Sequence, residues 1–284
     1  MHSRRVKEHD TQLSTLLKTI PDDENGKNYR RRTIARGGDT GIWLSTIQNS
    51  VNGNILGSQE FTDALRRQFA LPLKYLPDLC DGCGAKFSLE HAQSCKHGGL
   101  IHGRHDDVSY EIMSLASLAL RNRDVQAEPL INPGSLTSLR SNSQTDASDT
   151  NEPEGLRGDI FLNGFWGHGN KRTAAIIDVR VTDVDAASHR NRIAEKVLES
   201  QEKSKKSKYL QPCFNQRRSF TPFVVSSDGL LGREAKNLLK QLSIRLAEKW
   251  QKPYSVVAGI VRSRMSIAII RASHQCIRGS RIPF

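Results

Sequence analysis

Three of the chain's five cysteines fall within a short segment and, together with one histidine, follow the spacing of a metal site. The four residues are Cys80, Cys83, His91 and Cys95, in the pattern C-x2-C-x7-H-x3-C. Two cysteines two residues apart can direct both thiolates at one ion, and zinc favours such a mixture of sulfur and imidazole. Because four protein ligands close the coordination shell, we expect a structural zinc that folds a segment too short for its own core.

Two alternatives to this zinc site stay open. The four residues can also be reduced or buried side chains that hold no metal. Three further histidines, His97, His102 and His105, follow closely and could replace His91 as the fourth ligand.

Beyond the cysteines, helical and strand-like patterns alternate. The order from residue 104 to 250 is helix, strand, strand, strand, helix, strand, helix, an α/β pattern without an internal repeat. A polar stretch, 132–155, is rich in Ser, Thr, Asn, Asp, Pro and Gly and predicts a disordered insertion within this domain. Helices are expected over 104–121, 188–210, 231–250 and about 254–276, and strands over 125–131, 158–162, 173–182 and 221–229.

Two aspartates accompany the central predicted strands. Asp178 lies inside the apolar run AAIIDVRVT, where a buried carboxylate is costly unless it is paired or binds a metal. Asp159 opens the preceding strand, and adjacent strands can bring two carboxylates together to hold Mg²⁺. Such an ion could activate water and stabilise charge on a scissile phosphate. Glu111 and Glu128 could complete this acidic shell, and Asp183 and Asp185 follow the second strand, although any one of these acids is more often a cap, turn or salt-bridge partner.

A lysine usually follows the second acid of a nuclease motif by two residues, but Arg180 stands there in this chain. Arginine stays charged and is a poor proton shuttle, so the next helix is the expected source of the amine. Lys205 and Lys208 lie three residues apart on it, immediately before Tyr209. The lysines of this helix could equally form a solvated or phosphate-contacting face.

The excess of basic residues predicts a polyanionic partner, DNA or RNA. The chain has 42 Lys and Arg against 30 Asp and Glu, for a net charge of +12. The start lacks an apolar signal core and no long apolar run occurs, so we expect a nuclear or cytoplasmic protein. From Pro253 onward there is no acidic residue, although apolar residues there could pack the last helix onto the core. Candidate nucleic-acid contacts are Arg180, Lys196, Arg262, Arg264 and Arg271.

Several runs resemble the C-terminal region of reverse-transcriptase polyproteins from retrotransposons without long terminal repeats. They include CDGCGAKFSLEHAQSCKHGGLIHGRHDD, RGDIFLNGFW, AAIIDVRVTD, KKSKYL, FTPFVVSSDGLLGREAK and IRGSRIP, and the resemblance covers about residues 40–283. It implies a zinc knuckle followed by a nuclease of the PD-(D/E)XK superfamily, with a restriction-endonuclease-like core of helix, three strands, helix and strand. The chain shows no reverse-transcriptase signature, so it looks like the tail of such a polyprotein, as a fragment, a relic gene or a separated domain.

The resemblance also implies roles for particular residues. Asp159 matches the first acid, with Gly158 where the family usually has proline, and Asp178 matches the second. The family's lysine has moved to the next helix in a K-x-x-K-Y arrangement, matched here by Lys205, Lys208 and Tyr209. The acid of the first helix maps to Glu111.

These patterns predict five segments and three competing functions. The main hypothesis is a metal-dependent endonuclease that nicks DNA, the second a catalytically decayed zinc-containing nucleic-acid-binding module, and the third a protein-interaction domain built on the knuckle. The segments are a flexible basic tail (1–38), a helical segment (39–79), a zinc knuckle (80–99), a restriction-endonuclease-like domain (100–253, with the insertion 132–155) and a basic C-terminal helix (254–284).

Overall fold

The structure is a computed structural model that describes most of the chain. The described residues are 11–12, 14–15, 18, 29–47, 54–132, 155–167, 169, 172–189 and 191–282. Most of the predicted tail, and all but the two ends of the predicted insertion 132–155, lie outside these residues.

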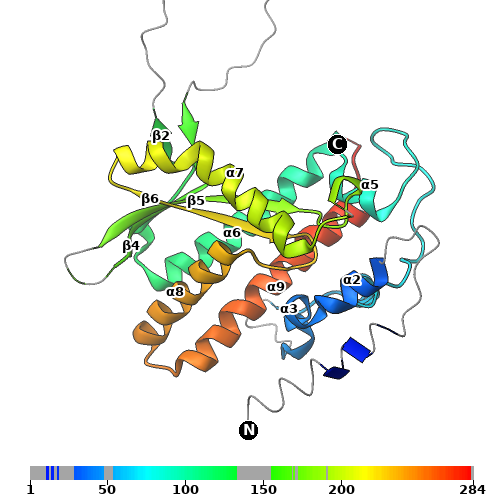
Figure 1. Cartoon of the computed structure of the whole chain (residues 1–284), viewed down its shortest axis with the longest axis horizontal. Helices are drawn as coiled ribbons and strands as arrows, with labels where there is room; N and C mark the ends of the chain where they lie inside the picture. The colour runs from blue at the N-terminus through cyan, green and yellow to red at the C-terminus, as the bar shows by residue number, and fades with distance from the viewer. Residues whose placement is uncertain are drawn as a thin grey trace, which may run out of the picture.

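A mixed four-stranded sheet in the order β1-β4-β5-β6 forms the centre of the molecule (Figure 1). Strand β1 (Val125–Ala127) pairs antiparallel with β4 (Ile160–Trp166), which pairs antiparallel with β5 (Thr173–Thr182). Strand β5 runs parallel to β6 (Ser219–Ser226). Because parallel neighbours need a crossover, helix α7 (Ala194–Asn215) connects them.

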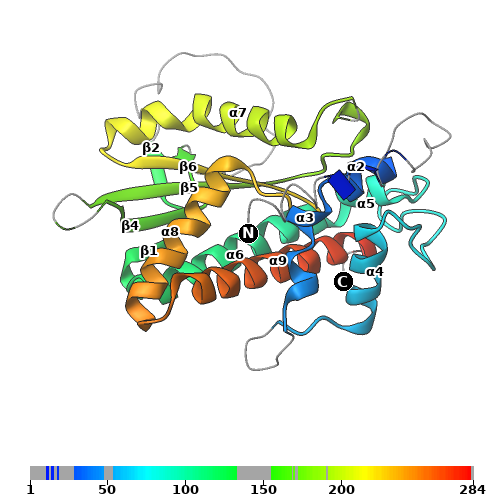
Figure 2. The ribbon, with the colours of Figure 1, turned by 60° about the horizontal axis from the view of Figure 1, so that its bottom comes forward.

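Helices cover both faces of this sheet (Figures 1 and 2). One face carries α7, and the other packs on α6 (Leu100–Ala119), α8 (Arg233–Trp250) and α9 (Tyr254–Arg278). Alternation along β5 divides its side chains between the two layers. Ile177 and Val179 belong to the main core with α6, α8 and α9, whereas Ile176 packs with Tyr209 of α7.

The structure confirms the mixed α/β class, and the elements from α6 to α8 follow the predicted order except that two additional short strands lie between β1 and β4. Strand β5 has the predicted bounds, and α6 buries Val108, Ile112 and Leu115 as its periodicity predicts. Helix α7 begins at Ala194, six residues later than expected, because residues 187–189 form a 3-10 turn. Among the described residues, no helix is both long and apolar enough to cross a membrane.

The predicted strand 125–131 is wrong as a single element. After β1 the backbone turns at Glu128, whose φ is 47°, and resumes as β2 (Leu130–Asn132). Strand β2 pairs with β3 (Leu156–Arg157) in a separate two-stranded sheet. Pro129 lies at the break and has no N–H to donate to a neighbouring strand.

The helical segment ahead of the cysteines consists of short elements. They are α3 (Gly37–Thr40), a 3-10 turn (Ile42–Ser45) and α4 (Ser58–Gln68). The sequence predicts Ser58 as the N-cap of α4, because serine is a favoured N-cap residue. In the structure Ser58 is the first helical residue; Gly57 is the N-cap, and its N–H donates to the Glu60 carboxylate at 2.7 Å.

The four-residue spacing of Phe61, Leu65 and Phe69 predicts that they form the buried face of α4, but the face that packs inward is a different one. Phe61 and Phe69 are 38% and 48% exposed, whereas Asp63 is buried at 2%. The burial of Asp63 follows from its ion pair with Arg278 of α9, whose Nε lies 2.8 Å from its Oδ2. A long-range ion pair therefore sets how α4 is rotated about its axis.

The predicted C-terminal boundary of the flexible tail, residue 38, is wrong, because ordered structure begins earlier in the sequence. Residues Tyr29–Ala35 form helix α2, and the following Arg36 is buried. Its guanidinium pairs with Asp185 and with Asp228, the latter at 2.6 Å from Nε. Burial opposes the charge of Arg36, but the two carboxylates outweigh it and raise its pKa. The last part of the predicted tail is therefore docked beside the ends of β5 and β6.

Candidate functional site

The four residues of the cysteine motif come together in one cluster. Their ligand atoms all lie within 4.8 Å of one another. Cys80 Sγ lies 3.9 Å from Cys95 Sγ, Cys95 Sγ lies 3.9 Å from Cys83 Sγ, and Cys83 Sγ lies 3.4 Å from His91 Nε2. Among the described residues, no other group of three or more His, Cys, Asp or Glu side chains lies close enough together to hold one metal ion.

The distances in this cluster fit a tetrahedral zinc. With Zn–S near 2.3 Å and Zn–N near 2.0–2.1 Å, tetrahedral angles place two sulfurs about 3.8 Å apart and a sulfur and nitrogen about 3.5 Å apart. The three separations in the cluster agree with these values, and all four ligand atoms lie within 4.8 Å of one another. The cluster can therefore hold a metal such as zinc, with four protein ligands and no open position.

Local backbone geometry brings the first two cysteines together. Gly84, with φ of 71°, closes a tight turn in which its N–H donates to the Cys80 carbonyl at 2.9 Å. Helix α5 (Leu89–Ser94) then supplies His91, whose N–H donates to the Ser88 side chain at 3.1 Å. Burial raises the pKa of the Cys80 thiol, but hydrogen bonds led by the Cys83 backbone outweigh it and lower the pKa to about 6. A thiol with that pKa is readily available as a thiolate ligand.

Arg281, which follows helix α9, connects this knuckle to the rest of the protein. Arg281 is only 3% exposed; its guanidinium donates to the Ala92 carbonyl at 3.3 Å and lies 5.4 Å from the Phe87 ring centre. The Asp81 carboxylate accepts the Arg281 backbone N–H at 2.7 Å. A Cβ on Gly98 would lie 2.4 Å from the Arg281 backbone, so glycine is required there.

The second candidate site is the pair Asp159 and Asp178. Asp178 lies within β5 at 3% exposure, and Asp159 immediately precedes β4. The Asp159 N–H donates to the Ile177 carbonyl at 3.0 Å, and its Oδ2 accepts the Val179 N–H at 2.5 Å. Antiparallel pairing of β4 and β5 therefore places the Asp159 carboxylate against the backbone beside Asp178.

Lys205 of α7 completes the pair from above the sheet. Its Nζ lies 2.5 Å from Asp178 Oδ2. Burial raises the pKa of Asp178 and the Asp159 charge adds to this effect, while Lys205 opposes it. Lys208 instead lies over the Tyr209 ring, 4.9 Å from its centre. Of the two predicted lysines, Lys205 is thus the one whose amine reaches the acids.

His105 is a member of this site that the sequence did not assign. Its Nε2 lies 3.1 Å from Asp159 Oδ2, and its Nδ1 lies 3.1 Å from Asp106 Oδ1. The hydrogen bond to Asp159 raises the pKa of His105 to about 9, against the opposing effect of burial. The sequence signal was the polar run RHDD opening a helix, which was interpreted only as a spare source of a zinc ligand.

Other predicted acids are used elsewhere. Glu111 lies six residues beyond His105, about 9 Å along α6, and pairs with Arg264 at 2.7 Å from its Nε. Glu128 has an exposed side chain, and its backbone N–H, not its carboxylate, approaches Asp159 by donating to the carbonyl at 2.8 Å. Asp185 pairs with Arg36. Of the acids predicted for the metal site, Asp159 and Asp178 are therefore the two that the pairing of β4 and β5 brings together.

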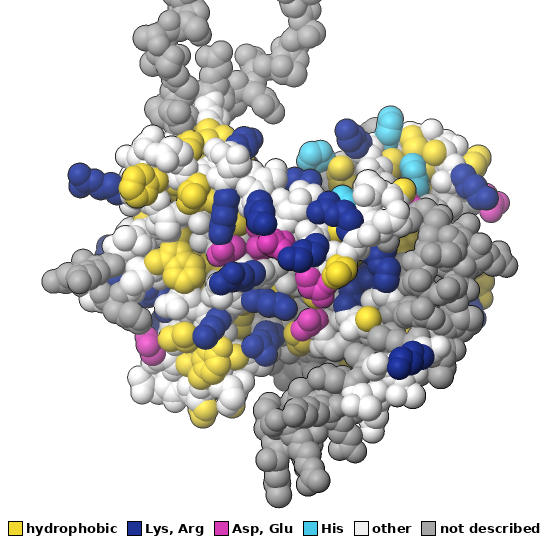
Figure 3. All heavy atoms as spheres, in the orientation of Figure 1, with side chains coloured by type: hydrophobic (Ala, Val, Ile, Leu, Met, Phe, Trp, Pro, Cys, Tyr) yellow, Lys and Arg dark blue, Asp and Glu magenta, His cyan; other side chains and the backbone are white. Residues whose placement is uncertain are grey.

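Of the five residues predicted to contact nucleic acid, three have partners within the protein and two are exposed. Lys196 pairs with Glu199 at 2.8 Å, Arg264 pairs with Glu111, and Arg271 donates to the Ile55 carbonyl. Figure 3 likewise shows basic and acidic side chains interleaved across the face that carries α7. Arg180 and Arg262 are exposed, and Arg180 follows Asp178 by two residues on the same side of β5.

Comparisons with known proteins add no relationship to this geometry. A scan against protein-family models found no match, and a search of curated proteins found no significantly similar one.

Proposed function

We propose that this chain is the endonuclease domain of a retrotransposon-derived protein, which hydrolyses phosphodiester bonds to nick DNA with the help of a divalent metal ion. The single observation that carries the proposal is the meeting of three groups from separate elements: Asp159 before β4, Asp178 within β5, and Lys205 from α7. Burying an aspartate at the centre of a sheet is costly, so a functional reason for Asp178 is expected.

The order of elements around these residues supports a restriction-endonuclease-like core. Helix α6, strands β1, β4 and β5, helix α7 and strand β6 follow the helix, three strands, helix, strand order of that superfamily, and β4 runs opposite to the other three strands of the sheet. The short sheet β2–β3 is an addition at the ends of the predicted insertion 132–155. The knuckle preceding α6 supports the retrotransposon origin in the same way.

Each residue of the site then has a distinct task. Asp159 and Asp178 would hold Mg²⁺, which supplies an activated water and offsets charge on the phosphate. Asp159 Oδ2 is occupied by the Val179 N–H and by His105, which orients the carboxylate. Lys205 holds Asp178 in its buried position and places a positive charge at the site. Arg180 is exposed nearby, where it can contact phosphate without moving a proton.

A second candidate function is a catalytically decayed module that binds nucleic acid and carries zinc. The observation favouring it is that both acids already have cationic partners, His105 for Asp159 and Lys205 for Asp178. Arg180 in place of the strand lysine, and Gly158 in place of proline, point the same way. This module would bind DNA or RNA through its basic surface and leave the phosphodiester bonds intact.

Nicking of a supercoiled plasmid separates the two functions. We expect the parent to nick in Mg²⁺ and not in EDTA, and Asp159→Asn or Asp178→Asn to reduce the rate at least 100-fold. Asp39→Asn is the matched control, since its carboxylate is exposed on α3 and 3.7 Å from Lys236. If the protein retards DNA on a native gel but shows no Mg²⁺- or Mn²⁺-dependent nicking, the nuclease proposal is wrong and the decayed binding module is supported instead.

A further inference from the structure

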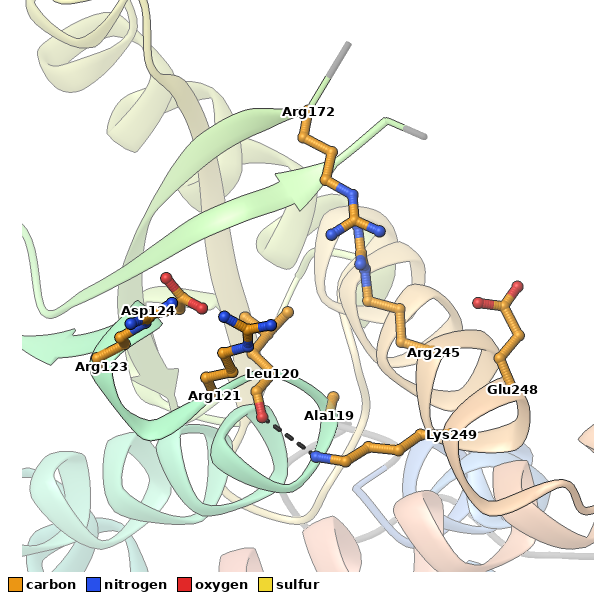
Figure 4. A pocket seen from close by; sticks show the side chains of 9 residues that line it. All are labelled: Ala119, Leu120, Arg121, Arg123, Asp124, Arg172, Arg245, Glu248 and Lys249. Atoms are coloured by element: carbon orange, nitrogen blue, oxygen red, sulfur yellow. Dashed lines mark hydrogen bonds between the residues drawn. The ribbon is translucent and has the colours of Figure 1, made fainter. Parts of the chain in front are cut away.

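A basic hollow lies on the opposite side of the sheet from α7, between the C-terminal end of α6 and helix α8. Its volume is about 690 Å³, within the range of ligand sites. Five cations and two carboxylates line it, so its charge is positive. Figure 4 shows the side chains of Arg172 and Arg245 directed toward one another across this space. The charged lining residues are Arg121, Arg123, Asp124, Arg172, Arg245, Glu248 and Lys249.

Two of the cations have structural tasks. Arg245 donates to the carbonyls of Gly164, at 3.1 Å, and Phe165, and so holds the hairpin between β4 and β5 against α8. Lys249 donates to the carbonyls of Leu118, at 2.7 Å, and Leu120, at 3.2 Å, which closes the end of α6. Their charges are fixed in place by the fold.

The other three cations are available for a ligand. Within the described part of the chain, the side chains of Arg121, Arg123 and Arg172 form no hydrogen bond or ion pair, and all three residues are exposed. Burial lowers the pKa of Arg245, and the nearby charge of Arg172 lowers it further. The Glu248 carboxylate opposes this shift without reversing it, and a bound anion would relieve the repulsion between the like charges that remains.

We propose that this hollow binds phosphate groups of a nucleic-acid backbone, as a second contact separate from Asp159 and Asp178; the inference rests on the proposed action on DNA. Guanidinium groups match phosphate oxygens in bidentate geometry. The lining has no aromatic side chain, so bases have nothing to stack on and the contact is independent of sequence. Arg172 precedes Asp178 by six residues of extended chain, about 20 Å, which separates the two contacts by several base pairs.

The test compares two double variants that remove the same charge. Arg123→Gln/Arg172→Gln empties the hollow of two free cations and leaves Arg245 and Lys249 in place. Lys240→Gln/Lys252→Gln is the control, because both lysines are exposed and lie outside the lining. Binding of a fluorescent 30-base-pair duplex is measured by anisotropy in EDTA from 50 to 300 mM salt, after equal thermal unfolding midpoints show that both variants fold.

Each lost phosphate contact reduces the magnitude of the slope of log affinity against log salt concentration by about 0.9. At 0.1 M salt this corresponds to an affinity about eightfold lower. We expect the hollow variant to lose one to two such contacts, and the control to keep a slope within 0.3 of the parent. Equal slopes for the two variants would overturn the inference while leaving nicking by the acid pair intact. A parent that fails to bind the duplex at 50 mM salt would overturn the inference together with the proposed function.

Discussion

The ion pair between Lys205 and Asp178 makes a strong prediction about stability. Replacing Lys205 with methionine keeps most of the side-chain volume but leaves a carboxylate that is 3% exposed without its cation at 2.5 Å. Breaking a buried pair by removing one partner costs about 3–5 kcal/mol. Because the Lys205 side chain is 21% exposed, we expect a loss at the lower end of this range, about 3 kcal/mol in the free energy of unfolding at pH 7.

The pH dependence gives this prediction its sign. Burial already raises the pKa of Asp178 and Lys205 opposes that rise, so Lys205→Met raises the pKa further. A group with a raised folded pKa favours folding below its unfolded pKa, and this contribution is lost as pH rises through the folded pKa. The variant should therefore be least stable at neutral pH and recover part of the loss on acidification.

Urea denaturation at pH 7 and pH 5 measures both effects. Lys208→Met is the matched control: this lysine is exposed, its amine lies over the Tyr209 ring and not against a carboxylate of the described residues, and its replacement should cost less than about 1 kcal/mol. Adding Asp178→Asn to Lys205→Met removes the stranded charge, so most of the lost stability should return. Equal losses for Lys205→Met and Lys208→Met would refute the reasoning.

Two further predictions concern the knuckle and His105. Purified protein should contain one zinc per chain, and Cys83→Ser should remove the metal and unfold the knuckle. Cys213→Ser is the control, because Cys213 is a buried cysteine of α7 outside the cluster, and this variant should retain the metal. Equal zinc content in both variants would exclude the cluster as the zinc site. His105 has a folded pKa raised to about 9, so its contribution to stability is complete below about pH 6.5 and is lost as pH rises through 9. Denaturation of the zinc-loaded protein without added Mg²⁺ or Mn²⁺ should show this loss in the parent and not in His105→Asn, and an unchanged pH profile in the variant would contradict the contact with Asp159.

Features set by local pattern were the ones that the sequence predicted well. The spacing of Cys80, Cys83, His91 and Cys95 fixes which atoms can meet, because a tight turn and one helical turn supply the geometry. The apolar run of β5 marks a central strand whichever elements surround it, so Asp178 could be recognised as a buried acid.

Contacts between distant segments could not be predicted from the same patterns. Glu111 was assigned by its position in a resembling family, but its partner Arg264 lies on another helix. His105 and Asp159 are 54 residues apart, and nothing in the local run RHDD specifies that the two side chains meet. Arg36 lies in a basic, polar stretch typical of a flexible tail, yet it is buried and forms ion pairs with two carboxylates from separate turns.

The central claim is that Asp159 and Asp178 jointly hold the divalent ion that supports cleavage. Binding of Mn²⁺ to the zinc-loaded protein, followed by electron paramagnetic resonance, tests it without depending on a DNA target. We expect one Mn²⁺ per chain in the parent and in Asp39→Asn, and at least tenfold weaker binding in Asp159→Asn and in Asp178→Asn. Equal Mn²⁺ binding in all four proteins, or none in the parent, would contradict the assignment of these two carboxylates as the metal site.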